Sequence, residues 1–207
     1  MRRLKDVVVA EPRLLLVGIN PGLRSGALGH HFAGNGNPFW RLLAEARLIP
    51  APLTCAEDQR LAESGIALTN LCPRPSRSAD ELGRDELLSG RNTLLRKCRA
   101  WKPDVMALVG VGLYPVIFGR GGPGGPGAKP DRVGTTAVYV VPNPSGLNAS
   151  FPGFASKLIW FRGLRDFLTA AAGNGSTLAP ARPPPDRSPR SRATASRRPS
   201  PVTAPDT

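Results

Sequence analysis

The fold of this chain follows from residues 14–22, which read Leu14-Leu15-Leu16-Val17-Gly18-Ile19-Asn20-Pro21-Gly22. An uninterrupted aliphatic run bounded by Gly and Pro is typical of a strand buried on both faces, as in parallel α/β sheets. Ligands of such sheets bind at the carboxyl ends of the strands, which is where Asn20 stands. Asn, Pro and Gly also dominate ordinary turns for local reasons. Taken alone, the segment therefore favours a simple strand-terminating turn.

Apolar segments further along the chain repeat this arrangement. After a long Gly-rich loop at 22–37, the spacing predicts strands and helices in alternation. We expect strands at 65–71, 104–111 and 136–141, and helices at 38–44, 85–101, 113–118 and 153–172. Strands separated by helices predict an α/β fold, a three-layer sandwich with a mainly parallel central sheet.

A second Gly-rich run covers residues 119–127 and contains six glycines and two prolines. It lacks the GxxxxGK[ST] spacing of a phosphate loop, and its prolines remove amide donors. We therefore expect a mobile loop rather than a phosphate cradle.

Composition divides the chain into two regions. Residues 174–207 consist mainly of Pro, Ser, Thr, Ala and Arg without apolar periodicity, so they cannot bury enough apolar surface to offset the entropy of ordering. We expect one domain at 1–173 and a disordered Pro/Arg-rich tail at 174–207.

The net charge of +13 points to nucleic acid as the partner class. The tail holds six Arg and two Asp, so the domain keeps +9. The three cysteines form no CxxC pair, which fits neither a zinc site nor a disulfide framework, and we expect no metal and no cofactor. The first residues are charged and no segment is long enough to cross a bilayer, so we expect a cytoplasmic protein without a membrane partner.

Three expected strand ends carry asparagines, Asn20, Asn70 and Asn143. Because the carboxyl ends of parallel strands meet at one edge of a sheet, these side chains should lie at the same edge. An amide offers both donors and an acceptor, so such a set suits the reading of a neutral base edge.

With these motifs the sequence resembles the mismatch-specific uracil/thymine-DNA glycosylase family of the uracil-DNA glycosylase superfamily. The matching motifs follow the family's order between residues 13 and 168. They are Gly18-Ile19-Asn20-Pro21-Gly22, Gly29-His30-His31-Phe32, Gly36-Asn37-Pro38-Phe39-Trp40, Leu68-Thr69-Asn70, Ser89-Gly90-Arg91 and Asn143-Pro144-Ser145-Gly146-Leu147. From the sequence, Arg91 could pair with a helix or with a phosphate.

The resemblance implies roles for residues of these motifs. Asn20 would position the attacking water, the Ile19 backbone and Phe32 would form the pocket, and Asn70 would read the pyrimidine edge. Ser25 and His31 would lie near the 5-position of the base, and Asn143 near the departing base anion. The implied duplex wedge and its contacts are Ser145, Gly146, Leu147 and Asn148. The family often carries an Arg near the wedge, where this chain has Asn148-Ala149.

The function implied is that of a monofunctional DNA glycosylase in base excision repair. It would hydrolyse the N-glycosidic bond of uracil, and of thymine or ethenocytosine, opposite guanine by base flipping. We expect a monomer, nucleoid-associated, with double-stranded DNA carrying G·U or G·T mismatches as its partner. The alternatives are a non-catalytic mismatch-sensing DNA-binding module and a nucleotide-dependent Rossmann-like enzyme, which the missing GxGxxG after Val17 disfavours.

Overall fold

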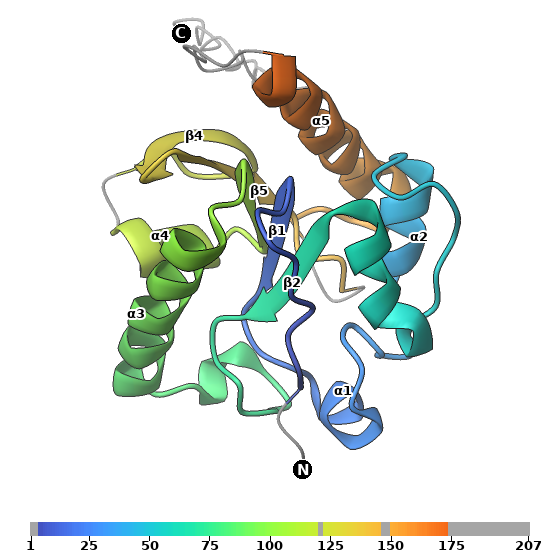
Figure 1. Ribbon diagram of the computed structural model, residues 1–207. Coiled ribbons are helices and arrows are strands. Elements are labelled where there is room, and N and C mark those ends of the chain that lie inside the picture. Colours follow the sequence, from blue (N-terminus) through green and yellow to red (C-terminus); the bar gives the residue numbers. More distant parts are fainter. Residues whose placement is uncertain (1–3, 120–121, 146–149, 174–207) are drawn as a thin grey trace, which may run out of the picture.

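The computed structural model describes residues 4–119, 122–145 and 150–173. The expected tail at 174–207 lies outside these ranges. A five-stranded sheet with the order β2-β1-β3-β5-β4 forms the centre (Figure 1). Its strands are β1 (Leu14–Gly18), β2 (Ile66–Asn70), β3 (Val105–Val109), β4 (Gly127–Val133) and β5 (Thr136–Val141). All neighbouring pairs are parallel except β4 with β5.

Helices cover both faces of the sheet, which confirms the three-layer α/β sandwich (Figure 1). Leu14 and Leu16 belong to the core on one face of the sheet, together with α2 (Phe39–Glu45), the 3₁₀ helix η1 (Cys55–Ser64) and α5 (Gly153–Gly173). Leu15 and Val17 face α3 (Arg84–Trp101) and α4 (Leu113–Phe118) instead. Successive side chains of a strand point to opposite faces, so the aliphatic run of β1 serves two separate cores.

Four elements were not expected from the sequence. Helix α1 (Leu23–Leu28) lies inside the stretch expected as a long loop, and η1 and the short 3₁₀ helix η2 (Ala79–Glu81) were also missed. Strand β4 was not expected either. It runs antiparallel at the sheet edge and contains Pro130 and a register shift between Lys129 and Arg132. Its sequence has no apolar run, and within sheets proline is confined to edge strands, strand starts and bulges, so hydrophobic periodicity could not reveal β4.

The opposite edge of the sheet is covered by the N-terminal segment. Val7 and Leu68 exchange two backbone hydrogen bonds of 2.9 and 3.0 Å in an antiparallel bridge. This pairing shields the exposed edge of β2. It also brings Lys5 and Asp6 beside the carboxyl end of β2, near Asn70.

In the Gly-rich loop, the described residues 123–125 surround a cation. Lys129 is 7% exposed, and its ammonium donates hydrogen bonds of 2.8, 3.2 and 2.8 Å to the carbonyl oxygens of Pro123, Gly124 and Gly125. Burial lowers the pKa of Lys129, and its Nζ lies 5.0 Å from the centroid of the Tyr114 ring. Carbonyl oxygens directed at an ammonium are the opposite of the N–H groups that hold a phosphate. The described residues 122–127 thus form no phosphate cradle, and Lys129 binds the carbonyls of three of them. The expected mobility of the loop stays a prediction.

The motif Ser89-Gly90-Arg91 serves the packing of α3. Arg91 Nε donates a hydrogen bond of 2.6 Å to the Ile117 carbonyl near the end of α4. Of the two partners that the sequence left open for Arg91, a helix or a phosphate, the structure shows the helix. A Cβ at Gly90 would lie 2.4 Å from the Leu71 carbonyl oxygen. Only glycine therefore allows α3 to approach the segment that follows β2 this closely.

Candidate active site

The parallel strands bring the three asparagines to the same edge of the sheet, but at different separations. Strands β1 and β2 are neighbours, with Gly18 paired to Asn70, so Asn20 and Asn70 leave the sheet side by side. Asn143 follows β5, two strand spacings from β1, which corresponds to about 10 Å. A Cβ at Gly110, just after β3, would be 3.8 Å from Asn143 Cβ. The centre of the site is therefore Asn20 and Asn70, with Asn143 on its flank.

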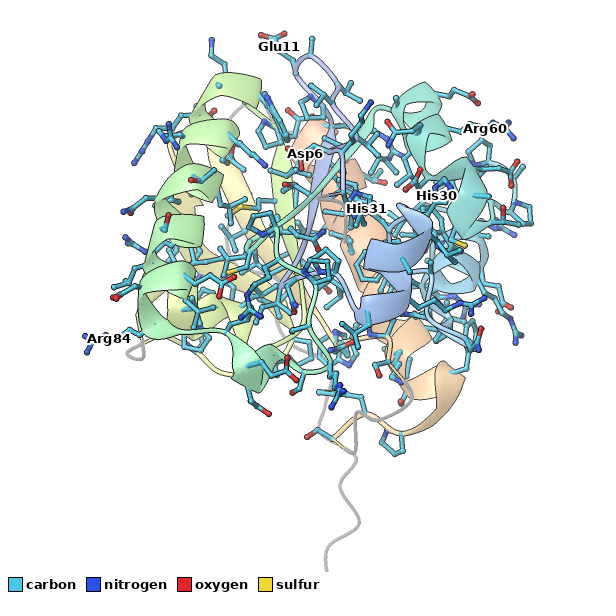
Figure 2. All side chains as sticks on the ribbon, turned by 90° about the horizontal axis from the view of Figure 1, so that it is seen from below. Asp6, Glu11, His30, His31, Arg60 and Arg84 are labelled. Atoms are coloured by element: carbon cyan, nitrogen blue, oxygen red, sulfur yellow. The ribbon has the colours of Figure 1, made fainter. Side chains whose placement is uncertain are left out.

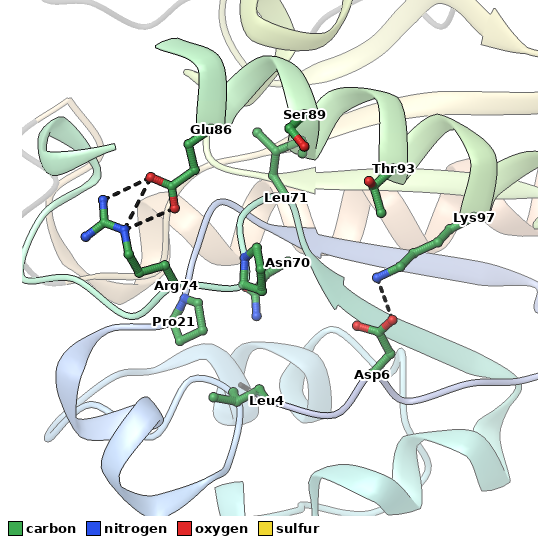
Figure 3. A pocket seen from close by; sticks show the side chains of 12 residues that line it. Leu4, Asp6, Pro21, Asn70, Leu71, Arg74, Glu86, Ser89, Thr93 and Lys97 are labelled. Carbon is green, nitrogen blue, oxygen red and sulfur yellow. Dashed lines mark hydrogen bonds and ion pairs between the residues drawn. The ribbon is translucent and has the colours of Figure 1, made fainter. Parts of the chain in front are cut away.

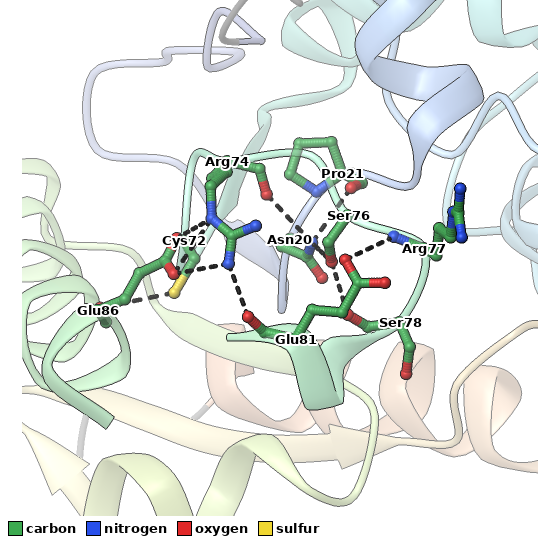
Figure 4. Close-up of polar contacts among 9 residues, drawn as sticks. All are labelled: Asn20, Pro21, Cys72, Arg74, Ser76, Arg77, Ser78, Glu81 and Glu86. Atoms are coloured by element: carbon green, nitrogen blue, oxygen red, sulfur yellow. Dashed lines mark hydrogen bonds and ion pairs between the residues drawn. The ribbon is translucent and has the colours of Figure 1, made fainter. Parts of the chain in front are cut away.

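The amide nitrogen of Asn20 is enclosed by hydrogen-bond acceptors. It donates to the carbonyl oxygens of Pro21 and Arg74 at 3.2 and 3.1 Å and to the Ser76 hydroxyl at 2.7 Å (Figure 4). Ser76, which is 3% exposed, donates its own hydroxyl proton to the Ser78 carbonyl at 2.6 Å. All three partners of the amide can thus only accept, which determines which side of the Asn20 amide carries the nitrogen.

This arrangement also fixes the position of the Asn20 carbonyl oxygen, which is an acceptor. Within the described ranges no donor bonds to Asn20 Oδ1. An oxygen held in this way can accept a hydrogen bond from a water molecule. An amide has no titratable proton acceptor near neutral pH, so Asn20 is suited to placing a water and not to removing its proton.

The segment that carries Ser76 is held by an ion pair. Arg74 donates to both carboxylate oxygens of Glu86 and to the Glu81 carbonyl (Figure 4). The Glu86 carboxylate raises the pKa of Arg74, and Arg74 in turn lowers the pKa of Glu86. Since Arg74 also supplies a carbonyl to Asn20, this pair links helix α3 to the Asn20 amide.

Phe32 lies close to both strand ends in an uncommon backbone conformation. Its φ is 50°, the left-handed region, which is rare for a bulky residue and concentrates at functional sites. Its ring stacks on Phe39 with centroids 3.7 Å apart. A Cβ at Gly18 would meet Asn70 Oδ1 at 2.4 Å and Phe32 Cζ at 3.4 Å. Gly18, Phe32 and Asn70 therefore converge on one point.

Hydrogen bonds on either side of Phe32 hold it in that conformation. The Ala33 N–H donates to Ser25 Oγ at 3.0 Å, and Arg24 Nε donates to the Ala33 carbonyl at 3.0 Å. The His31 N–H donates to Asp58 Oδ2 at 2.9 Å. Ser25 is 4% exposed, so in this structure its hydroxyl acts on the backbone after Phe32. Its expected place beside the 5-position of the base stays a prediction.

His31 is buried behind Asn70, at 2% exposure. Its Nε2 lies 3.0 Å from the Lys5 carbonyl oxygen and its Nδ1 lies 3.3 Å from Asn70 Nδ2. In Figure 2, His31 and His30 lie between the N-terminal segment with Asp6 and helix η1. Burial lowers the pKa of His31, while the Lys5 hydrogen bond and the charge of Asp58 oppose this shift. The imidazole is thus suited to stay neutral at physiological pH.

The motif after β5 is only partly described. Asn143 Oδ1 accepts a hydrogen bond of 2.9 Å from the Ser145 N–H. Lys157 of α5 is 2% exposed, and its ammonium donates to the carbonyl oxygens of Pro144 and Ser145 at 3.2 and 2.9 Å. The expected wedge residues Gly146, Leu147 and Asn148 lie outside the described residues.

A cavity of about 730 Å³ adjoins Asn70 on the side of α3. Asn70 lies between the Arg74–Glu86 and Lys97–Asp6 ion pairs that border it (Figure 3). Neither Asn20 nor Phe32 lines this cavity, so it lies beside the Asn20 site and is not its centre. The described ranges contain no group of three His, Cys, Asp or Glu side chains that could hold a metal ion. They also contain no helix long and apolar enough to span a membrane.

The fold and this edge of the sheet define a class of protein. The Uracil DNA glycosylase superfamily matches residues 5–162, and the chain belongs to that superfamily. It is also similar to the G/U mismatch-specific uracil DNA glycosylase of Schizosaccharomyces pombe, with 30% identity over 169 residues. This match covers 77% of the chain and 52% of the relative, so the chain spans about half the length of the curated relative that it matches. The resemblance inferred from the motifs is confirmed.

Sequence reasoning missed three groups of the site, namely Ser76, Asp58 and the Lys5 carbonyl. Each acts on a residue far away in the chain, and a single Ser or Asp has no distinctive spacing. The only signal for Ser76 was its place in the polar stretch after Asn70. A backbone carbonyl such as that of Lys5 carries no sequence signal at all.

Proposed function

We propose that this protein is a monofunctional DNA glycosylase that releases uracil opposite guanine from double-stranded DNA. The observation that carries the proposal is the Asn20 amide, held by three acceptors with its oxygen available to a water, beside Asn70 and Phe32. Membership of the superfamily and similarity to a G/U mismatch-specific enzyme support the same reaction.

In the proposed reaction, water oxygen forms a bond to C1′ of the deoxyribose as the N-glycosidic bond breaks. The bonding electron pair leaves with the base as an anion, and the proton of the water passes to solvent. Such cleavage goes through an oxocarbenium-like state, which needs little help from a strong nucleophile. Asn20 Oδ1 would contribute by placing the water, since positioning alone lowers a barrier substantially. Asn143 would stand on the side where the base anion leaves.

Access to the base requires flipping, which costs a few kcal/mol and less for a mispaired base. We propose that Phe32 stacks on the flipped base with the ring face that Phe39 does not cover, and that Asn70 and the Ile19 backbone contact its edge. Leu147 would fill the vacated stack, as inserted apolar side chains do in other DNA-binding proteins, with Ser145, Gly146 and Asn148 against the duplex. The positive charge of the chain supports binding to the phosphate backbone.

The direct test is a duplex with one G·U pair, incubated under single-turnover conditions and then treated with alkali to cleave abasic sites. We expect strand scission with the native protein and a loss of at least about 100-fold in Asn20→Ala, because a misplaced water costs this much. Asn92→Ala, an exposed asparagine of α3, is the matched control and should retain the native rate. Tight, salt-sensitive mismatch binding without scission would instead establish the non-catalytic mismatch-sensing module.

Substrate range and cellular setting extend this proposal. A panel of uracil, thymine and ethenocytosine opposite guanine would rank the three lesions, and we expect uracil to be the fastest because it has no 5-methyl group to accommodate. Sedimentation of the protein alone and with duplex tests the expected monomer. Its cytoplasmic, nucleoid-associated location stays a prediction, to be checked by fluorescence imaging in cells.

A further inference from the structure

The contact between His31 and Asn70 determines the orientation of the Asn70 amide. His31 Nε2 faces the Lys5 carbonyl oxygen at 3.0 Å, and a carbonyl oxygen can only accept. The ring proton must therefore sit on Nε2. In a neutral imidazole the other nitrogen, Nδ1, is then an acceptor.

This tautomer decides which atom of Asn70 lies against the ring. Nδ1 is 3.3 Å from the Asn70 amide nitrogen, and an acceptor at this position favours the amide N–H₂ over the amide oxygen. The oxygen is left on the opposite side, over Gly18, where an added Cβ would meet it at 2.4 Å. Without His31, neither orientation of the Asn70 amide would be favoured by this neighbour.

The orientation matters because uracil and cytosine present opposite patterns on the same edge. Uracil offers the O4 acceptor and an N3–H donor, whereas cytosine offers the N4–H₂ donor and an unprotonated N3. With its oxygen and one remaining N–H available, Asn70 can pair with both groups of uracil. A cytosine in the same position would place donor against donor and acceptor against acceptor, which leaves buried polar groups unpaired.

We propose that His31 is a positioning residue for base selection, which holds the Asn70 amide in the orientation that accepts uracil and rejects cytosine. This inference rests on the proposed function, since it takes Asn70 as the reader of the base edge. His31 acts through Asn70 because it is 2% exposed and both of its ring nitrogens are engaged. His31 is itself held by two hydrogen bonds. The Lys5 carbonyl accepts from its ring, and Asp58 accepts from its backbone N–H.

The charges around His31 determine when this arrangement holds. Asp58 from η1, Asp6 from the N-terminal segment and the adjacent His30 act on the ring electrostatically. Asp6 is itself paired with Lys97 of α3, at 2.5 Å, and accepts a hydrogen bond of 2.7 Å from Thr69. At neutral pH the buried ring is neutral and accepts from Asn70. In acid, a proton on Nδ1 would face the Asn70 N–H₂ and favour the reversed amide.

Binding of non-cleavable substrates tests this proposal without catalysis. The probes are duplexes with 2′-fluoro-2′-deoxyuridine or 2′-fluoro-2′-deoxycytidine opposite an abasic-site analogue, so that flipping breaks no base pair. The measured quantity is the ratio of Kd for the cytosine probe to Kd for the uracil probe. We expect this ratio to fall about tenfold or more in His31→Leu, because tenfold corresponds to one hydrogen bond of about 1.4 kcal/mol.

The matched control is His30→Leu. His30 belongs to the same loop and contacts Asp58, but no hydrogen bond joins it to Asn70 among the described residues. Loosening of the loop should therefore change both Kd values alike and leave their ratio within threefold. Lowering the pH until the His31 ring takes up a proton should reduce the ratio in the native protein more than in His31→Leu. Protonation of cytosine itself would appear equally in both. A ratio that is unchanged in His31→Leu would overturn the proposal.

A measurement on the native protein covers the case in which His31→Leu does not fold. Imidazole ¹⁵N chemical shifts at pH 7.5 should show a proton on Nε2 and none on Nδ1 of His31, and a proton on Nδ1 would overturn the proposal. Failure of the proposed function is distinguishable, since a protein that does not cleave the G·U duplex fails there first. A protein that cleaves it, but whose base preference is independent of His31, contradicts this inference alone.

Discussion

Replacing Gly18 with alanine should disable the site while leaving the fold intact. The added Cβ would lie 2.4 Å from Asn70 Oδ1 and 3.4 Å from Phe32 Cζ. Ordinary contact of a Cβ begins near 3.4 Å, so the Asn70 oxygen must move by about 1 Å. Misplacement on this scale costs about 100-fold in rate, and we expect that loss in single-turnover excision of uracil from a G·U duplex.

The Asn70 side chain can yield more easily than the backbone of the buried strand. Thermal unfolding of Gly18→Ala should therefore stay close to that of the native protein, which separates a site defect from a folding defect. Gly22→Ala is the matched control, because this glycine lies in the same turn but an added Cβ would meet nothing within 4 Å. It should retain excision within about threefold, the scale of an uncoupled surface change.

Two results would refute this reasoning. Native-like excision by Gly18→Ala would mean that Asn70 does not need its observed position. Equal losses in Gly18→Ala and Gly22→Ala would mean that the turn is sensitive to any side chain, and the contact with Asn70 would then explain nothing.

Three further predictions concern the support of the site, its response to pH and the tail. Ser76→Ala removes one of three acceptors of the Asn20 amide and should slow excision about tenfold, the equivalent of one hydrogen bond. Ser78→Ala leaves the backbone carbonyl that accepts from Ser76 in place and should not slow excision. Similar rates for both variants would count against the role of Ser76. Because burial lowers the pKa of His31 below its ordinary value of 6.5, the unfolded chain takes up this proton first as the pH falls. The free energy of unfolding should then decrease below about pH 6.5, by at most about 1.4 kcal/mol per pH unit. Urea unfolding of the native protein and of His31→Leu at several pH values checks this, and an identical dependence of the free energy of unfolding on pH in both would contradict it. Truncation after Gly173 should leave single-turnover excision unchanged and reduce the salt dependence of DNA binding by roughly one unit of slope per lost phosphate contact, whereas slower excision would show that the tail acts in the reaction.

Much of the fold could be predicted because it depends on patterns that are local in sequence. The aliphatic runs of β1, β3 and β5 and the helical spacing of α3 and α5 are each complete within one segment, and all five elements were expected. Strand β4 could not be predicted in this way, since an edge strand with a proline and a buried lysine has no alternating pattern. Helix α1 was missed because it has only six residues and contains a glycine.

Of the candidate site, the sequence supplied the residues that stand at strand ends but not the groups that orient them. Parallel strands bring Asn20 and Asn70 together as a consequence of topology, so both could be named in advance. The contacts of Asn20 with Ser76, and of His31 with Asn70 and Lys5, join residues 56, 39 and 26 positions apart. No spacing rule connects such residues.

The amino-acid sequence by itself determined the α/β class, the edge at which the site lies and the family to which the chain belongs, because hydrophobic runs and short motifs are legible one segment at a time. The tertiary structure alone decided how the side chains act. It fixed the orientation of the Asn20 amide by surrounding its nitrogen with acceptors, and it placed a neutral imidazole next to Asn70. The direction of a hydrogen bond depends on both partners, and here the partners meet only after the chain has folded.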